Sequence, residues 1–360
     1  MQNLKKALSL LTDVDGILLT SEPNRYYCTQ GGVSEGVALV SKNGCCYYTD
    51  SRYIEAAQNG IHGFAVKMVD RQNPYTKRLA EDVALLGIQR LGYEEGSLTV
   101  KEFKIYEEAL KVEFVPMQAR LDALRWCKES WELDRMRKAQ AITDRAFSQV
   151  LERICVGMTE KQLQAELIYC LYKNGADGLS FDPIVVSGPN TSLPHGEASD
   201  RVIREGDFVT MDFGVILNGY CSDMTRTVAV GHATEEMVTV YNTVLQAQLA
   251  GIAATKPGVK GKDIDAAARQ VIADAGYGEY FGHGYGHGAC CHAGKRHPRD
   301  VLEAKVVHAR NTLPCSGQGQ AHLHKQQGAK CNASSKAPFS TQSKTSFGFA
   351  KANLWRNQQR

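Results

Sequence analysis

The sequence predicts an α/β protein made of two successive domains, and three observations support that prediction. Short apolar strands alternate with amphipathic helices over residues 14–112. Between residues 121 and 288 the order is two helices followed by a hairpin, and then two more helices. Beyond that point the apolar periodicity stops. We therefore expect a small α/β domain over 1–120, an α+β domain over 121–288 and a basic, low-complexity tail over 289–360.

The expected first domain begins with three short strands, which read GILLTS, GVALVS and CCYYTD and are separated by Pro-Asn and Asn-Gly turns. A YIEAAQ helix and the strand FAVKMVD at 64–70 follow. Residues 76–112 repeat the order helix, strand, helix, and a domain boundary is expected near 115–128. This alternation is typical of a sheet covered by helices.

The expected second domain opens with one long amphipathic helix over 128–154. Thr159 followed by Gln162 is a capping-box pattern, which predicts the start of another helix. A strand and a loop rich in Pro, Gly and Asn fill 181–197, and that loop presents His195. Two helices after Thr227 complete the pattern. These helices should cover a sheet.

Composition places the chain among ordinary soluble proteins. It has 360 residues, of which 43% are hydrophobic and 22% charged. Its first residues lack the long apolar core of a secretory signal, and no stretch approaches the roughly 20 apolar residues of a membrane span. We therefore expect a cytoplasmic protein that binds no membrane. The eleven cysteines are scattered, odd in number and set in apolar contexts such as those of Cys155 and Cys170, so reduced thiols in the core are expected.

Charge separates the last segment from the rest. Residues 289–360 hold twelve Lys or Arg against Asp300 and Glu303, a net +10 that leaves −7 for the preceding residues of a +3 chain. Such a composition cannot bury a core, so the segment is predicted to be disordered or the product of a shifted reading frame. A nucleic-acid-binding tail is the competing interpretation. We do not favour it, because the charges are dispersed, and we expect no nucleic-acid partner.

The candidate chemistry begins with two carboxylates, Asp212 and Asp223, at the polar ends of apolar runs that an Asn-Gly turn folds into a hairpin over 207–227. Two like charges on adjacent strands are costly unless a cation lies between them. The alternative is that both acids are exposed and only cap strand ends. Against it stand the apolar flanks and the downstream cluster FGHGYGHG, where His283 and His287 are good ligands for Mn, Co or Zn.

Six motifs in order resemble those of one known family, the pita-bread metallopeptidases, and within it the Xaa-Pro aminopeptidase and Xaa-Pro dipeptidase branch. The resemblance covers about residues 8–288. The motifs are NRYY at 24–27, TDSRY at 49–53, PHG at 194–196, MDFG at 211–214, SDMTRT at 222–227 and HGYGHG at 283–288. The resemblance implies a creatinase-like N-terminal domain followed by a pita-bread catalytic domain.

The resemblance also implies the roles of the site residues. Asp212 would chelate one of two divalent ions, most simply Mn²⁺ with Co²⁺ or Zn²⁺ as alternatives, Asp223 would bridge both ions, and His287 would bind the second. His195 and His283 would hold the substrate and handle protons. The implied substrates are peptides with proline at the second position. In this family the smaller domain contributes oligomer contacts, which allows a homodimer.

The resemblance fails after residue 288, where the family carries two further glutamate ligands. This chain has no Glu after Glu303, so the catalytic domain is incomplete as written and its activity is expected to be impaired. Two other classes remain open. One is a catalytically inactive pita-bread protein that only binds, and the other is a creatinase-like hydrolase that works without metals. Retention of the two aspartates and His287 argues against the second.

Overall fold

The computed structural model describes residues 2–31, 33 and 35–286. These residues divide into two compact units. The first comprises the N-terminal part of the chain up to Ala139, together with residues 216–222. The second comprises residues 140–215 and 223–286. The predicted tail over 289–360 and His287 lie outside the described residues. The domain limits at 120 and 288 remain predictions.

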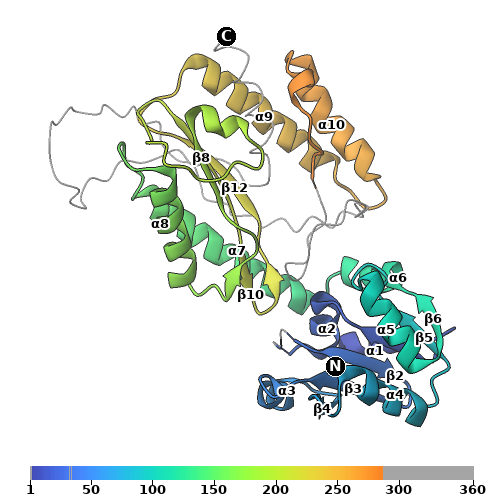
Figure 1. Cartoon of the computed structure of the whole chain (residues 1–360). Coiled ribbons are helices and arrows are strands. Elements are labelled where there is room, and N and C mark those ends of the chain that lie inside the picture. Colours follow the sequence, from blue (N-terminus) through green and yellow to red (C-terminus); the bar gives the residue numbers. More distant parts are fainter. Residues whose placement is uncertain (1, 32, 34, 287–360) are drawn as a thin grey trace. The chain divides into compact units, whose positions relative to one another are not determined.

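A six-stranded mixed sheet forms the centre of the first unit, in the order β4-β3-β2-β1-β5-β6 (Figure 1). The strands are β1 (Gly16–Leu19), β2 (Val37–Ser41), β3 (Gly44–Thr49), β4 (Ala65–Met68), β5 (Arg90–Tyr93) and β6 (Glu113–Pro116). Antiparallel pairs join β1 to β2 and β2 to β3, while β1–β5, β3–β4 and β5–β6 are parallel. The mixture confirms the predicted α/β class.

Helices cover both faces of this sheet, because side chains along each strand alternate between two cores. The helices are α1 (Gln2–Ser9), α2 (Glu22–Thr29), α3 (Ile54–Gly60), α4 (Tyr75–Leu85), α5 (Val100–Leu110) and α6 (Gln118–Trp126). Ile17 and Leu19 belong to the core that also contains residues of α1, α2, α3 and α6. Leu18 belongs to the opposite core, with Leu79 of α4 and residues of α5.

One prediction for this unit is wrong. The Pro-Asn pair at Pro23 was expected in a turn, but it lies in the first turn of α2, where Ser21 caps the helix. Proline is compatible with that position, since its missing N–H would have no partner inside the helix. The boundary expected near 115–128 stays a prediction, and this stretch contains the end of β6 and all of α6, which buries Leu121.

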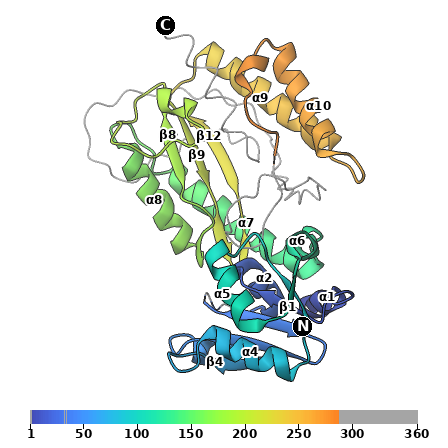
Figure 2. The ribbon, with the colours of Figure 1, turned by 45° about the vertical axis from the view of Figure 1, so that its right-hand side comes forward.

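In the second unit, a three-stranded antiparallel sheet has the order β12-β9-β8 (Figure 2). Its strands are β8 (Ile184–Ser187), β9 (Phe208–Phe213) and β12 (Met224–Ala229). The chain between β9 and β12 forms the short strands β10 (Val215–Leu217) and β11 (Tyr220–Cys221). Another short strand, β7 (Gly178–Leu179), precedes β8. The predicted hairpin is therefore confirmed. Its stem is the pair β9–β12 and its tip is the separate pair β10–β11.

Helices also accompany this sheet: α7 (Ser130–Leu151), α8 (Glu160–Lys173), α9 (Glu235–Ala254) and α10 (Gly261–Asp274), with the short 3-10 turns η1 (Gly188–Ser192) and η2 (Gly278–Tyr280). Phe147 of α7 stacks on Phe213 with ring centroids 6.3 Å apart. On the other face of β9, Phe208 lies 6.4 Å from the ring of Tyr241 in α9. The predicted capping box of Thr159 is present at the start of α8.

The tip of the hairpin belongs to the first unit and turns at Asn218 and Gly219, whose φ angles are 48° and 74°. Two positive φ angles are the signature of the two-residue turn that an Asn-Gly pair favours. The hydroxyl of Tyr26, from the NRYY motif, donates to the carbonyl of Asn218 at 2.6 Å. A Cβ on Gly219 would lie 2.2 Å from the Tyr26 ring, so glycine permits this contact.

None of the cysteines in the described part of the chain forms a disulfide, as expected. Cys170 is buried, whereas Cys155, which was expected in the core, is exposed. Within residues 2–31, 33 and 35–286, no helix combines the length and the apolar character needed to cross a membrane.

Candidate active site

The register of the hairpin brings the two candidate carboxylates to the same face. Asp212 pairs with Thr225 across β9 and β12. The tip pairs Ile216 with Cys221, which continues the same register. Asp223 lies two residues before Thr225, so the alternation of side chains places it on the face of Asp212, one diagonal step away. Diagonal neighbours have Cα atoms about 7–8 Å apart, whereas directly opposite residues are nearer 5 Å.

Around Asp212 this face of the hairpin carries polar side chains. Asp212 is 4% exposed, and its Oδ1 accepts the hydroxyl of Thr225 at 2.8 Å. Two residues further along, the hydroxyls of Thr210 and Thr227 lie 3.0 Å apart. Asp223 is half-buried. The alternative prediction, that both acids are exposed strand ends, is wrong for Asp212, which lies inside the strand.

His195 lies at the corner of a turn beside this sheet. The backbone N–H of Gly196 donates to the carbonyl of Leu193 at 3.1 Å, which closes a four-residue turn with Pro194 and His195 at its centre. Proline is favoured at the second position of such turns. A Cβ on Gly196 would lie 2.8 Å from a methyl group of Val186, so the residue after His195 packs closely on β8. The local sequence therefore sets the position of the exposed imidazole.

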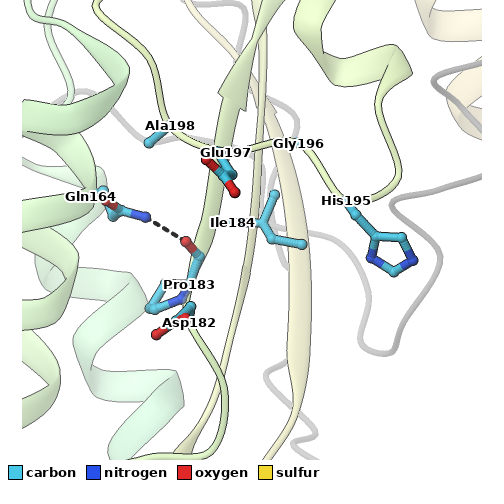
Figure 3. Close-up of a pocket in the computed structure, with 8 residues that line it drawn as sticks. All are labelled: Gln164, Asp182, Pro183, Ile184, His195, Gly196, Glu197 and Ala198. Carbon is cyan, nitrogen blue, oxygen red and sulfur yellow. Dashed lines mark hydrogen bonds between the residues drawn. The ribbon is translucent and has the colours of Figure 1, made fainter.

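His195 and Ile184 line a common pocket. It is lined by the residues drawn in Figure 3, which are Gln164, Asp182, Pro183, Ile184, His195, Gly196, Glu197 and Ala198. Ile184 pairs directly with Asp212 across β8 and β9, so their side chains share a face. In Figure 3 the ring of His195 lies apart from Gln164 and Asp182, on the side toward which Ile184 extends.

His283 lies on an exposed segment after η2 that is held by two residues of α10. Arg269 donates to the carbonyls of Phe281 at 2.7 Å and His283 at 3.0 Å, and its guanidinium lies 4.4 Å from the centre of the Phe281 ring. Asp265 accepts the backbone N–H of Tyr285 at 2.8 Å. The histidine segment therefore has fixed backbone anchors up to residue 285.

Tyr285 extends this anchoring to α9. Its hydroxyl donates to the carbonyl of Gln248 at 2.9 Å. Burial raises the pKa of Tyr285 to about 12, so the phenol is neutral at physiological pH and keeps its proton for this bond. His287, the predicted third metal ligand, follows two residues later and lies outside the described residues.

The described residues include two of the three predicted metal ligands, Asp212 and Asp223. Over residues 2–31, 33 and 35–286, no three His, Cys, Asp or Glu side chains are grouped so that they could hold an ion. Two carboxylates on one face are nevertheless the hard oxygen donors that Mn²⁺ accepts. The roles of Asp212, Asp223, His195, His283 and His287 therefore stay predictions, and the first two fit a divalent ion best.

Sequence reasoning missed the residues that support these side chains. Thr225 stands inside the SDMTRT motif, but its bond to Asp212 depends on the register of the strands. Asp265 and Arg269 are four residues apart on a helix, a spacing that favours the ion pair between them. Their contacts with the His283 segment could be found only from the folded structure.

Comparison with known proteins defines the class of the molecule. The model of the creatinase/prolidase N-terminal domain matches residues 1–127, and that of metallopeptidase family M24 matches residues 134–312. The chain belongs to metallopeptidase family M24, the pita-bread family, and combines a creatinase-type N-terminal domain with a pita-bread domain. The predicted family and fold class are thus confirmed.

Individual relatives cover most of this chain. It is 41% identical over 276 residues to the uncharacterized peptidase YqhT of Bacillus subtilis, covering 76% of this chain and 78% of the relative. An Xaa-Pro dipeptidase of Pyrococcus horikoshii is 33% identical over 296 residues, covering 80% of this chain and 81% of that protein.

Solved structures agree with these relatives. An Xaa-Pro dipeptidase from Bacillus anthracis superimposes with a TM-score of 0.75 at 40% identity, covering 81% of both chains. The X-Pro aminopeptidase from Thermotoga maritima gives a TM-score of 0.74 at 33% identity, covering 81% of this chain and 82% of that one. These similarities support peptidase chemistry.

Proposed function

We propose that this protein is a metal-dependent peptidase that hydrolyses Xaa-Pro bonds at the N-terminus of short peptides or in dipeptides. The observation that carries the proposal is the pair Asp212 and Asp223 on one polar face of the β9–β12 hairpin, in a chain of the pita-bread metallopeptidase family. The names of its relatives, Xaa-Pro dipeptidase and X-Pro aminopeptidase, support the substrate class. The cytoplasm is the proposed location.

The proposed metal ligands are Asp212 for one ion, Asp223 between two ions and His287 for the second. Carboxylate oxygens together with one imidazole suit Mn²⁺, and also Co²⁺ or Zn²⁺. When bound, such ions lower the pKa of a coordinated water and polarise a carbonyl. Thr225 donates its hydroxyl to Oδ1 of Asp212 at 2.8 Å, which helps to fix the orientation of this carboxylate.

The two other histidines have proposed roles at the substrate. His195, presented by the turn at residues 193–196, would contact the substrate carbonyl and exchange a proton with it. His283, whose backbone carbonyl accepts a hydrogen bond from Arg269, would also bind the substrate. A neutral imidazole can donate and accept at its two nitrogens, which suits both roles.

We further propose that the chain as written has reduced metal affinity and turnover. No Glu occurs in residues 304–360, and the family resemblance calls for two glutamate ligands after residue 288. Loss of two carboxylates removes both charge and coordination, so affinity for each ion should fall steeply. A protein that binds peptides without cleaving them is the alternative that this observation favours.

The test compares three proteins loaded with Mn²⁺, which are the wild type, Asp223→Ala and His195→Ala. Peptides with proline at the second position are compared with the same peptides carrying alanine there, and metal content is measured by mass spectrometry. Asp223→Ala should lose metal and activity together. His195→Ala should lower turnover while metal content stays near that of the wild type.

A version of the protein in which the family's two Glu-bearing strands are restored after residue 288 distinguishes an impaired peptidase from a wrongly proposed function. It should cleave the proline peptides faster than the chain as written. Full activity of Asp223→Ala, or a preference for peptides without proline, would refute the proposed site and substrate. Two tight Mn²⁺ sites in calorimetry of the chain as written would refute the proposed impairment.

A further inference from the structure

The first residue of α8, Glu160, has a fully buried carboxylate that binds two distant segments of the chain. Its Oε1 accepts the backbone N–H of Ser187 at 2.6 Å and the hydroxyl of the same residue at 2.7 Å. Its Oε2 accepts the backbone N–H of Ser199 at 3.0 Å and that residue's hydroxyl at 2.7 Å. The amide of Asn190 donates to both oxygens, at 3.1 and 3.3 Å.

These contacts are more than the start of a helix requires. Thr159 and Gln162 already form the capping box, in which each side chain accepts the backbone N–H of the other residue. The carboxylate of Glu160 is therefore free of any capping role. Its position at the N-terminus of α8 still favours negative charge, because the helix dipole is positive there.

The two serines mark the ends of the loop that presents His195. Ser187 is the last residue of β8, and Ser199 follows the turn that carries Pro194, His195 and Gly196. Beyond Ser199, the chain pairs with the start of α8, since the N–H of Glu160 donates to the carbonyl of Arg201 at 3.1 Å. A single buried group therefore holds the entry and the exit of the loop at a fixed separation.

We infer that Glu160 is a positioning residue for His195, acting by holding both ends of the loop at 188–198. The inference rests on the proposed function for its catalytic consequence, but the positioning itself is a property of the fold. Glu160 itself has no contact with the substrate. Its effect on the reaction passes through the place and orientation of the His195 imidazole.

Glu160→Gln is the informative change, because it keeps the size of the side chain and removes one acceptor. The amide nitrogen of the new glutamine cannot accept a hydrogen bond, so the backbone N–H of either Ser187 or Ser199 loses its partner. A displacement of about 1 Å at a reacting group can lower a rate by roughly a hundredfold. We expect kcat/KM for a proline peptide to fall at least about tenfold, with Mn²⁺ content unchanged.

A double-mutant cycle with His195→Ala shows whether the effect passes through the histidine. If it does, Glu160→Gln lowers kcat/KM in the wild type and has no further effect once His195 is alanine. Equal losses in both backgrounds, or no loss in the wild type, would overturn the inference. The full chain is used for all four proteins.

Glu94→Gln is the matched control, since Glu94 is also fully buried and lies in the other compact unit. Its carboxylate accepts the N–H of Thr20 at 2.6 Å, the N–H of Ser21 at 2.9 Å and the amide of Asn24 at 2.6 Å. This variant should lose stability in a similar way and keep kcat/KM. A similar loss of kcat/KM in Glu94→Gln would show that buried carboxylates matter only for folding.

A readout independent of activity distinguishes failure of this inference from failure of the proposed function. The ring signal of His195, assigned among the ten histidines by comparison with His195→Ala, is recorded by NMR without metal. In Glu160→Gln it should shift, and the amides of Ser187 and Ser199 should exchange faster. An unchanged ring signal would overturn the inference. Absence of peptidase activity in the version with the two Glu-bearing strands restored would refute only the proposed function.

Discussion

The ion pair between Arg201 and Asp207 offers a stringent test of the packing beside the candidate site. The guanidinium donates to both carboxylate oxygens, at 2.7 and 2.9 Å, and the side chains are 21% and 12% exposed. Asp207 also accepts the backbone N–H of Arg204 at 2.8 Å. Arg201 donates in addition to the hydroxyl of Ser187 at 2.6 Å. The pair therefore holds the start of the His195 loop.

We expect Asp207→Ala to lower the free energy of unfolding of the second compact unit by about 3 kcal/mol. Removing one partner of a buried pair costs about 3–5 kcal/mol, because the remaining charge stays in a poorly solvated place. Because both side chains remain partly exposed, this cost falls to about 2 kcal/mol. Loss of the Arg204 N–H bond adds about 1 kcal/mol. Arg201→Met combined with Asp207→Leu should recover most of the loss, since it removes both charges.

The assay is hydrogen exchange of peptides from β8 and β9 in increasing urea, which reports the unfolding of this unit by itself. The control is Asp200→Ala, which breaks the Lys161–Asp200 pair, whose side chains are 57% and 84% exposed. Exposed pairs contribute about 0–1 kcal/mol. If Asp207→Ala changed stability by no more than this control does, the argument from burial would be refuted.

Two further predictions concern stability. The carboxylate of Asp15 accepts the backbone N–H of Arg90 at 2.9 Å, and this bond is the main cause that holds the pKa of Asp15 below its usual 3.8. Because the pKa of Asp15 is lowered in the folded state, its carboxylate stabilises the protein above about pH 4, and this stabilisation is lost as the pH falls through the folded pKa. Urea melts of wild type and Asp15→Asn should therefore differ at pH 7 and converge near pH 2. Alanine normally stabilises a helix relative to glycine, but a Cβ on Gly251 in α9 would lie 2.2 Å from the Tyr285 ring. Gly251→Ala should therefore lower the melting temperature, whereas Gly60→Ala, which meets no atom within 4 Å, should leave it unchanged or raise it.

Local sequence patterns predicted most of the elements, because their causes lie within a few residues. The capping box at Thr159 depends on a residue three positions away, and the turn at Asn218 depends on the glycine that follows it. Pro23 misled the prediction for a related reason. Proline fits both a turn and the first turn of a helix, and the choice is made by burial of α2 in the core.

The candidate site was less accessible to sequence reasoning because its geometry depends on register and on distant contacts. The pattern placed Asp212 and Asp223 on one hairpin, but only the pairing of Asp212 with Thr225 shows that they are diagonal neighbours. Ile184 links the His195 pocket to Asp212 through a pairing of strands 28 residues apart in sequence. Glu160 contacts Ser199 across 39 residues, and no local pattern records such a contact.

The anchoring of the loop by Glu160 also has a consequence for protein engineering. Since Ser187 and Ser199 are fixed by one carboxylate, the segment between them behaves as an exchangeable module with two defined attachment points. Lengthening a loop whose ends are already held together adds little closure entropy, about 0.6 kcal/mol for each doubling of its length. Grafts between these serines should therefore be tolerated by the fold, and the residues around His195 can be varied to recruit new peptide substrates without redesign of the sheet.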